Sequence, residues 1–426
     1  MHRSLLVVMG VIAISGCASG FKPTQIQRMR FEPARQAEQR GDYASAFAVY
    51  QDAAEDGIVH AQYRVAQMHE KGEGTAPDVA QAARWYAAAA AADHPQALRA
   101  LARMYEQGQG VEQDDAAALA LYRRSAAAGE PSSSFKVGQF LEQGRGAEPD
   151  PVGAAGFYRA AAEDGRFDAQ LALARLYESG TGVARDPAEA ERWYAAAAAP
   201  LAAAAAQGDP RAQEELGELY LSGRGVPKDV ERGLALLGSA AEGGRVGAQV
   251  QLARLFASGS DGVPQDPTRA AGYYEMAAAQ GNRGARYELA KLYAEGLGVP
   301  QDGLLAARLF EQAAAQGETN AYVRIGDLYA RGEGLAANHA EANRWYAEAA
   351  RHGDPKGMFR LGEAHERGNG VGTDQVRALM WYSLAYDQGY AQAAGRVARV
   401  GERLDDSQRR QADALAAEWR RENGAS

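Results

Sequence analysis

The chain has 426 residues, a formal net charge of −9, and 49 glycines against 15 prolines. A chain of this length exceeds one ordinary hydrophobic core, so we expect either several domains or an elongated array of repeats. The acidic balance argues against general nucleic-acid binding, which needs clustered Lys and Arg for phosphate contacts. Because Cys17 is the one cysteine, a disulfide framework within the chain is excluded.

Residues 1–16 have the pattern of a lipoprotein signal peptide. Arg3 supplies a short cationic start, and the apolar run 5–14 is too short to span a bilayer as a helix. The sequence Ile14-Ser15-Gly16-Cys17 resembles the lipobox of bacterial lipoproteins, in which a peptidase cleaves before the cysteine and the thiol receives a diacylglycerol. The resemblance implies lipidation of Cys17, and Ala18 in place of the inner-membrane retention Asp favours the outer membrane. Ordinary cleavage beside an unmodified cysteine is the alternative.

Two short segments precede the main body of the chain. Residues 17–30 are predicted to form a lipidated tether, whose basic side chains suit an anionic membrane surface or are simply solvated. Residues 31–60 predict a tetratricopeptide-like helix pair that turns at Gly41-Asp42-Tyr43.

Residues 61–392 contain nine copies of one pattern. The first four copies start 36 residues apart, at Ala61, Ala97, Ser133 and Ala169, and the later ones start at Ala212, Ala248, Ala285, Ala321 and Gly357. Each copy predicts a first helix, a Gly-x-Gly loop that allows the positive φ of a helix C-cap, and a second helix with an Asp N-cap and an aromatic pair. A period of this length is typical of a helical-repeat array.

An insertion near residues 195–207 interrupts the period around Pro200. Seven extra residues make about two helical turns. We therefore expect the second helix of repeat four to be longer, and Pro200 to kink or break it. Any hinge should lie here, between repeats four and five. After the array, residues 393–426 predict C-terminal capping helices, with a polar helix that starts at Asp405-Asp406-Ser407.

The repeating pattern resembles the Sel1-like repeat family, which is related to the tetratricopeptide repeats. The resemblance implies an all-α fold, a right-handed α-solenoid of helix-turn-helix Sel1-like repeats. Two departures from the pattern are visible. His69 and His365 stand at the aromatic position of the first helix, and Leu236-Leu237 replaces the aromatic pair in repeat five.

Motifs that carry chemistry are weak in this sequence. The Gly-x-Gly loops follow helices rather than strands, so they predict helix caps and not phosphate-binding turns. The seven histidines lack metal-ligand spacing, and carboxylate pairs such as Asp114-Asp115 lie at helix starts, where the helix dipole favours them. We therefore predict no catalytic residue, no metal site and no cofactor, and we do not expect an enzyme.

The remaining candidate for function is the surface. In tetratricopeptide-like arrays the first helices line a concave face where partners dock. Carrying that register over gives a candidate concave binding face: Tyr63, Arg99, Arg103, Phe135, Leu171, Arg175, Arg254, Tyr287, Lys291 and Phe359. Such an aromatic row beside a charged row suits an extended peptide or an acidic polymer. The alternative is that the apolar residues pack between neighbouring first helices and the charged ones are solvated.

These features predict a non-catalytic, lipid-anchored scaffold of the outer membrane, facing the periplasm and binding other cell-envelope proteins. The layout is also similar to the lipoproteins of alginate-type exopolysaccharide secretion, which implies an outer-membrane porin and periplasmic polysaccharide-processing proteins as partners, and no nucleic acid. The alternative is a surface-exposed adhesin or host-factor-binding lipoprotein, because a repeat fold does not by itself fix a function.

Overall fold

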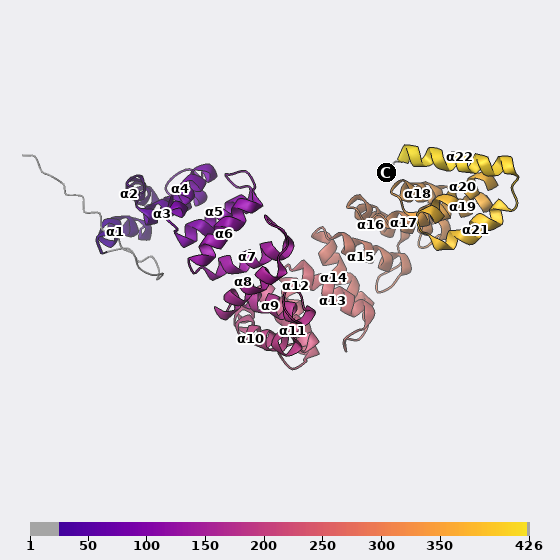
Figure 1. Ribbon diagram of the computed structural model, residues 1–426. Coiled ribbons are helices and arrows are strands. Elements are labelled where there is room, and N and C mark those ends of the chain that lie inside the picture. Colours follow the sequence, from indigo (N-terminus) through magenta and orange to yellow (C-terminus); the bar gives the residue numbers. More distant parts are fainter. Residues whose placement is uncertain (1–24, 424–426) are drawn as a thin grey trace, which may run out of the picture. The chain divides into compact units, whose positions relative to one another are not determined.

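The computed structural model describes residues 25–423, with side chains from residue 31. Within these residues every regular element is a helix and none is a strand. Within residues 25–179, and again within residues 210–387, each helix packs against the next one along the chain, so that hairpins follow one another (Figure 1). The predicted all-α solenoid of helix-turn-helix repeats is confirmed.

The chain divides into two compact units. The first runs to Pro200 and includes the short segment Arg224–Val226, and the second comprises Leu201–Gly223 and the chain from Pro227 onward. The first unit contains α1 (Gln25–Gln39), α2 (Tyr43–Glu55), α3 (Val59–Lys71), α4 (Val79–Ala91), α5 (Pro95–Gln107), α6 (Asp115–Ala127), α7 (Pro131–Gln143), α8 (Pro151–Glu163), α9 (Phe167–Ser179) and the start of α10 (Pro187–Ala206).

The second unit contains the remaining helices. They are α11 (Pro210–Ser222), α12 (Val230–Glu242), α13 (Val246–Ser258), α14 (Pro267–Ala279), α15 (Arg283–Glu295), α16 (Gly303–Ala315), α17 (Ala321–Arg331), α18 (His339–Arg351), α19 (Pro355–Arg367), α20 (Gln375–Asp387), the 3₁₀ turn η1 (Ala391–Ala393), α21 (Ala394–Gly401) and α22 (Asp406–Asn423).

The ends of the helices follow the predicted capping chemistry. In repeat two, α5 ends at Gly108, which adopts a left-handed conformation with φ +66°. The carboxylate of Asp114 then accepts hydrogen bonds from the N–H groups of Ala116 and Ala117 at 2.9 Å, which caps α6. The N–H of Asp114 donates to the carbonyl of Tyr105 at 3.0 Å. The loop is thus tied to both helices of its own repeat.

The second glycine of each loop has a different role, which the sequence did not reveal. A Cβ atom on Gly146 would lie 2.3 Å from the carbonyl oxygen of Asp115, the first residue of α6 in the preceding repeat. On Gly182 it would lie 2.1 Å from the carbonyl oxygen of Pro151, the first residue of α8. The loop backbone therefore packs directly against the neighbouring repeat, at a distance that only glycine permits.

The insertion lengthens α10. This helix has 20 residues, against 13 in α8, and it continues past Pro200 without a break. Proline removes one backbone hydrogen bond, but the alanines on both sides have the highest helix propensity. The next Gly-x-Gly loop keeps its usual contact, because Gly225 lies against Tyr194 and not against the first residue of α10, Pro187. That shift of seven residues matches the length of the insertion.

The two ends of the array differ from its repeats. Helix α1 begins at Gln25, inside the segment that the sequence predicted to be a tether, and Asp42 caps α2 after the predicted turn. At the other end α22 packs against α20 (Figure 1), with the rings of Trp381 and Trp419 4.7 Å apart. Because Trp381 is only 8% exposed, α22 covers the apolar side of the last full repeat.

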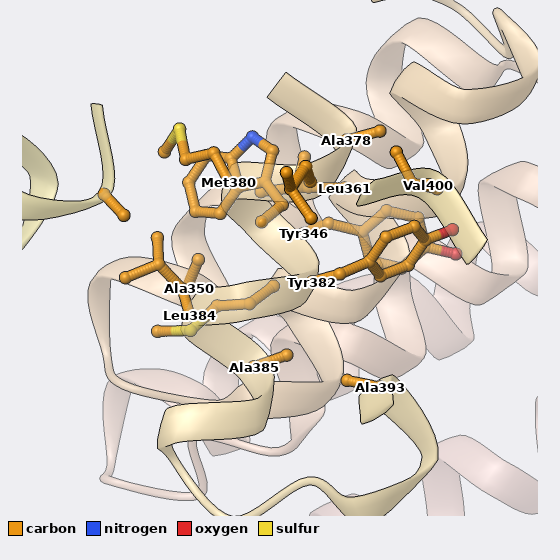
Figure 2. Close-up of a cluster of buried hydrophobic side chains, with 14 of the residues drawn as sticks. Tyr346, Ala350, Leu361, Ala378, Met380, Tyr382, Leu384, Ala385, Ala393 and Val400 are labelled. Carbon is orange, nitrogen blue, oxygen red and sulfur yellow. The ribbon is translucent and has the colours of Figure 1, made fainter. Parts of the chain in front are cut away.

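Small residues of the first helices make room for large rings of the second helices. Gly326 and Gly362 each lie so close to a tyrosine that an added Cβ would approach the rings of Tyr346 and Tyr382 to 2.4 Å and 2.6 Å. Figure 2 shows these two tyrosines in one buried cluster, with their hydroxyl groups at the same edge, away from Leu384. Each ring is buried, and its hydroxyl group donates to a carboxylate of the first helix, Tyr346 to Asp327 and Tyr382 to Glu366.

Candidate interaction surface

The aromatic residues of the predicted binding row lie on first helices and pack against second helices. The ring of Tyr63 on α3 lies 5.8 Å from that of Tyr86 on α4. The same arrangement recurs for Phe135 with Tyr158 (5.5 Å), Tyr287 with Phe310 (5.2 Å) and Phe359 with Tyr382 (5.2 Å). Phe135 and Leu171 are buried, whereas Tyr63, Tyr287 and Phe359 keep part of their surface exposed. These side chains therefore stabilise the hairpins, and their part in binding stays a prediction.

The charged residues of the row are more accessible. Arg99, Arg103, Arg175 and Arg254 are exposed, and Lys291 is half-buried beside Glu288, with 2.7 Å between the ammonium and the carboxylate. Arg103 forms an ion pair with Glu70 of the preceding repeat. Exposed pairs of this kind contribute only about 0–1 kcal/mol each, so they leave these side chains able to exchange partners.

A polar contact that the sequence reasoning missed joins the two helices of five repeats. A buried tyrosine of the second helix donates a hydrogen bond to a glutamate near the end of the first helix, 16 residues earlier. The pairs are Tyr86–Glu70 (2.6 Å), Tyr122–Glu106 (2.7 Å), Tyr158–Glu142 (2.6 Å), Tyr194–Glu178 (2.9 Å) and Tyr382–Glu366 (2.7 Å). The recurrence of Glu and Tyr at this spacing was visible in the sequence, and it could have indicated the contact.

Cations from the following repeat complete this contact, which we call the tyrosine–carboxylate link. Glu106 also accepts from Lys136 at 3.1 Å and from Arg145 at 3.2 Å. Glu178 pairs with Arg224 at 2.7 Å. Where a cation is present, the link therefore joins the two helices of one repeat and also ties that repeat to the next one.

The electrostatics of the link hold the proton on the tyrosine. Burial, followed by the hydrogen bond to Glu178, raises the pKa of Tyr194 to about 12. Burial opposes ionisation of Glu106, but the hydrogen bonds from Tyr122 and Lys136 outweigh it and lower the pKa of this carboxyl. A neutral phenol and an ionised carboxylate are poor partners for proton transfer near neutral pH, so the arrangement favours a structural role.

A hollow of about 620 Å³ lies between α11 and α13, on the face that carries the predicted row. Arg254, one of the predicted residues, lines it together with Val250, Glu214 and Glu218. Glu214 is held by Arg245, with 2.7 Å between Nε and the carboxylate. The hollow therefore lies between the first helices of repeats five and six, with aliphatic and charged groups on its walls.

Other kinds of site find no support in the described residues. Across residues 25–423, no three His, Cys, Asp or Glu side chains gather as a metal site would require. No helix in the same range is both long and apolar enough to cross a membrane. Burial lowers the pKa of His69 and His365, and the Nδ1 atoms of both rings are buried without a hydrogen-bond partner. Cys17 lies outside the described residues.

Repeated helical hairpins, loops locked by paired glycines and contacts between successive repeats define a helical-repeat solenoid. The Sel1 repeat model matches nine segments: 59–94, 95–130, 131–165, 167–199, 210–244, 246–282, 284–318, 319–354 and 355–390. These segments cover most of the chain, which therefore belongs to the Sel1 repeat family. Sel1 repeat proteins mediate protein–protein interactions, and their scaffold is typically non-catalytic.

Solved structures agree with this assignment. The chain is similar to c5321, a protective antigen of uropathogenic Escherichia coli strains with an SLR fold, at 27% identity and a TM-score of 0.64, covering 92% of this chain and 83% of that one. It is also similar to a Sel1 repeat protein from Oxalobacter formigenes, at 29% identity and a TM-score of 0.51, covering 70% of this chain and 89% of that one. Among curated proteins, none matches significantly.

Proposed function

We propose that the protein is a lipid-anchored scaffold of the outer membrane that binds other cell-envelope proteins along its first-helix face. The main support for this binding surface is the exposed side chain of Arg254, which lies on the wall of the hollow between α11 and α13. Arginine beside aliphatic and aromatic groups is the composition of protein interfaces, where its planar donors bind carboxylates and carbonyls. The anchor rests on the sequence around Cys17.

Photo-crosslinking in cells tests the surface. A photoreactive residue is placed at Arg103 on α5 or at Arg254 on α13, one in each compact unit. Two exposed apolar residues of second helices serve as matched controls: Val152 on α8, 69% exposed, and Leu304 on α16, 58% exposed. We expect envelope proteins to crosslink at the two arginine positions and not at the controls. Equal yields at all four positions would contradict a first-helix binding face.

The identity of the crosslinked proteins tests the pathway. We propose an exopolysaccharide secretion assembly of the alginate type as the site of action. It predicts an outer-membrane β-barrel and periplasmic polysaccharide-processing proteins among the products. Recovery of other envelope proteins alone would keep the scaffold and discard this pathway.

Lipidation is measured separately. A tagged protein grown with a labelled fatty acid should carry the label, and the variant Cys17→Ala should lose both the label and outer-membrane fractionation. Stable anchoring needs more than one acyl chain, which a lipidated N-terminal cysteine provides. A labelled Cys17→Ala variant would show that the lipid is attached elsewhere.

A second candidate is display on the outer surface as an adhesin or host-factor-binding protein. The similarity to c5321, which is described as a protective antigen, favours it. Protease treatment of intact cells distinguishes the two orientations. A periplasmic scaffold survives the treatment, whereas a displayed protein is cut while periplasmic markers stay whole.

A further inference from the structure

Repeat nine shows what a complete tyrosine–carboxylate link requires. Glu366 on α19 accepts from Tyr382 at 2.7 Å and from Arg396 at 3.1 Å. Arg396 also reaches Glu363, one turn earlier on the same helix, at 3.6 Å. Two carboxylates one turn apart thus share the cation of Arg396 in this repeat, while the phenol of Tyr382 donates to Glu366 alone. A second cation, that of Arg403, lies 3.8 Å from Glu366.

Repeat eight retains the donors of the link but lacks its main acceptor. Ala330 stands where repeat nine has Glu366. Tyr346 donates instead to Asp327, one turn earlier, at 2.8 Å. Arg360 takes the place of Arg396 and lies 3.2 Å from Asp327. The phenol and the guanidinium are present, and one of the two carboxylates is missing.

The space beside Ala330 is a pocket of about 180 Å³, which we call the repeat-eight pocket. It lies between α17, α18 and α19, within the second compact unit. Its walls include Tyr346, Arg331, Arg360, Arg367 and Asn343, whose amide also donates to the carbonyl of Asn369 at 2.7 Å. A cavity of this size holds a carboxylate group, and these side chains are donors for one.

The charges around the pocket leave room for an added anion. Three arginines line the pocket with two carboxylates, those of Asp327 and Glu363, and Arg360 contacts both, at 3.2 Å and 2.9 Å. A third carboxylate, that of Glu333, pairs with Arg331 from outside the lining. The side chains of Arg331 and Arg367 are each 55% exposed, and their acidic partners lie 3.1 Å and 3.6 Å away. Such exposed pairs are weak, so both guanidinium groups can turn to a new carboxylate at little cost.

Two other repeats also have alanine at this position, and neither retains both donors. In repeat seven, with Ala294, the tyrosine is replaced by Phe310. In repeat six, with Ala257, the position that corresponds to Arg360 holds Glu288. The combination of phenol, guanidinium and missing acceptor therefore occurs in repeat eight alone among these three.

We propose that the repeat-eight pocket binds a carboxylate supplied by a partner protein, either an Asp or Glu side chain or a C-terminal carboxylate. The incoming group occupies the place that Glu366 fills in repeat nine, where Arg360, Arg331 and Arg367 neutralise it. The proposal rests on the scaffold function and names the chemistry of one contact in it. Arginine forks bind carboxylates with two parallel hydrogen bonds, which fixes the orientation of the partner as well as adding affinity.

The test uses the purified protein and three short peptides, measured by ligand-observed NMR and calorimetry. One peptide carries glutamates between blocked ends, one has no acidic side chain but a free C-terminal carboxylate, and one is neutral and fully blocked. We expect a carboxylate peptide to bind with a Kd on the order of 1 mM or tighter and the neutral peptide not to bind. The peptide that binds identifies the source of the carboxylate.

The decisive variant is Ala330→Glu, which supplies the missing carboxylate from within. Repeat nine shows that a glutamate here is compatible with an acidic residue one turn earlier. We expect binding to weaken at least about tenfold, while the thermal midpoint is kept or raised, because the new carboxylate gains the charge-assisted contacts that Glu366 has in repeat nine. Ala257→Glu, the same change in repeat six, should leave binding unchanged. Arg367→Gln should weaken binding, and Arg344→Gln, outside the pocket, should not.

Two results would overturn the proposal: no peptide binds, or a peptide binds Ala330→Glu as well as the original chain. Neither result touches the scaffold function, because that is decided by crosslinking at Arg103 and Arg254 in cells. A chain that binds the peptides but crosslinks to no envelope protein would instead retain the pocket and lose the proposed function.

Discussion

In repeats one to four the buried tyrosine of the second helix donates to a glutamate of the first helix, whereas in repeats five to seven that glutamate is Leu221, Ala257 or Ala294. Repeat five replaces both partners with leucines, and Leu221 and Leu237 lie in one buried cluster. Repeat seven replaces the tyrosine with Phe310, which is fully buried beside Ala294. In these two repeats the donor and the acceptor were lost together.

The paired loss follows from the energetics of buried hydrogen bonds. Removing one partner leaves the other desolvated and unsatisfied, at a cost of about 1–3 kcal/mol, whereas replacing both with apolar groups is nearly neutral. The repeat fold therefore needs a filled volume at this point and not a particular polar pair. What the link adds is a carboxylate at the surface that holds a cation of the next repeat, as Glu106 holds Lys136.

The largest expected effect on stability comes from replacing a loop glycine that lies in close contact with the preceding repeat. In Gly146→Ala the new methyl group would meet the carbonyl oxygen of Asp115 at 2.3 Å, at a φ of +70°. We expect the free energy of unfolding to fall by about 3 kcal/mol or more, because the positive φ and the clash both destabilise the fold. Urea denaturation followed by circular dichroism measures it.

The matched control lies in repeat six, where the loop has one extra residue. Gly262 has a comparable φ of +88°, but the nearest atom to its added Cβ is a methyl group of Val230 at 3.6 Å. Gly262→Ala should cost only the conformational penalty, about 1–2 kcal/mol. Equal losses in the two variants would mean that backbone conformation, and not contact between repeats, requires the second glycine.

The next largest effect on stability is expected when one tyrosine–carboxylate link is broken. Glu106→Ala removes the acceptor and leaves the hydroxyl of Tyr122 buried, and Lys136 loses its carboxylate, whereas Arg145 keeps Asp115. We expect a loss of about 2 kcal/mol from the unsatisfied donor. The double variant Glu106→Ala/Tyr122→Phe copies the residues of repeat seven and should recover about half of that loss. The thermal midpoints of the single and double variants measure the difference.

Tyr122→Phe alone is the control that completes the cycle. Glu106 then keeps Lys136 and Arg145 as partners, so the loss should stay below about 1 kcal/mol. If the stability loss of the double variant equalled the sum of the losses of the two single variants, the two side chains would contribute independently. The paired replacement in repeats five and seven would then need another explanation.

The sequence predicted what is encoded locally and missed what depends on how helices pack. The period, the Asp caps and the longer α10 follow from neighbours within a turn or two, so composition and spacing were sufficient. The partner of Gly146 lies in another repeat, and the partner of Tyr122 lies on another helix. The placement of Phe135 was left open for the same reason: whether it faces its own second helix or a groove depends on how the two helices cross.

The smallest expected effect is a pH dependence of stability that arises from the histidine cap of α5 and is absent from the asparagine cap of α15. In the first unit His94 accepts from the N–H of Ala97 through Nδ1, at 3.3 Å, whereas in the second unit Asn282 accepts from the N–H of Ala285. Burial, followed by the charge of His60, lowers the pKa of His94 from 6.5 to about 4. The unfolded chain therefore binds the proton more readily than the folded one between these two values. The contribution of His94 to stability should therefore be fully present above this window and should fall as the pH drops through it.

The variant His94→Asn isolates this contribution, because it keeps a cap acceptor and places the residue of the second unit in the first. Acid also protonates carboxylates, so the original chain and the variant must be compared at the same pH. Urea midpoints at pH 7 should be similar, since both side chains accept from Ala97. At pH 4.5 the variant should be the more stable of the two, because protonated His94 can no longer accept at Nδ1 and carries a buried charge. Parallel pH dependences would show that His94 does not titrate in this window, and that the two caps are equivalent.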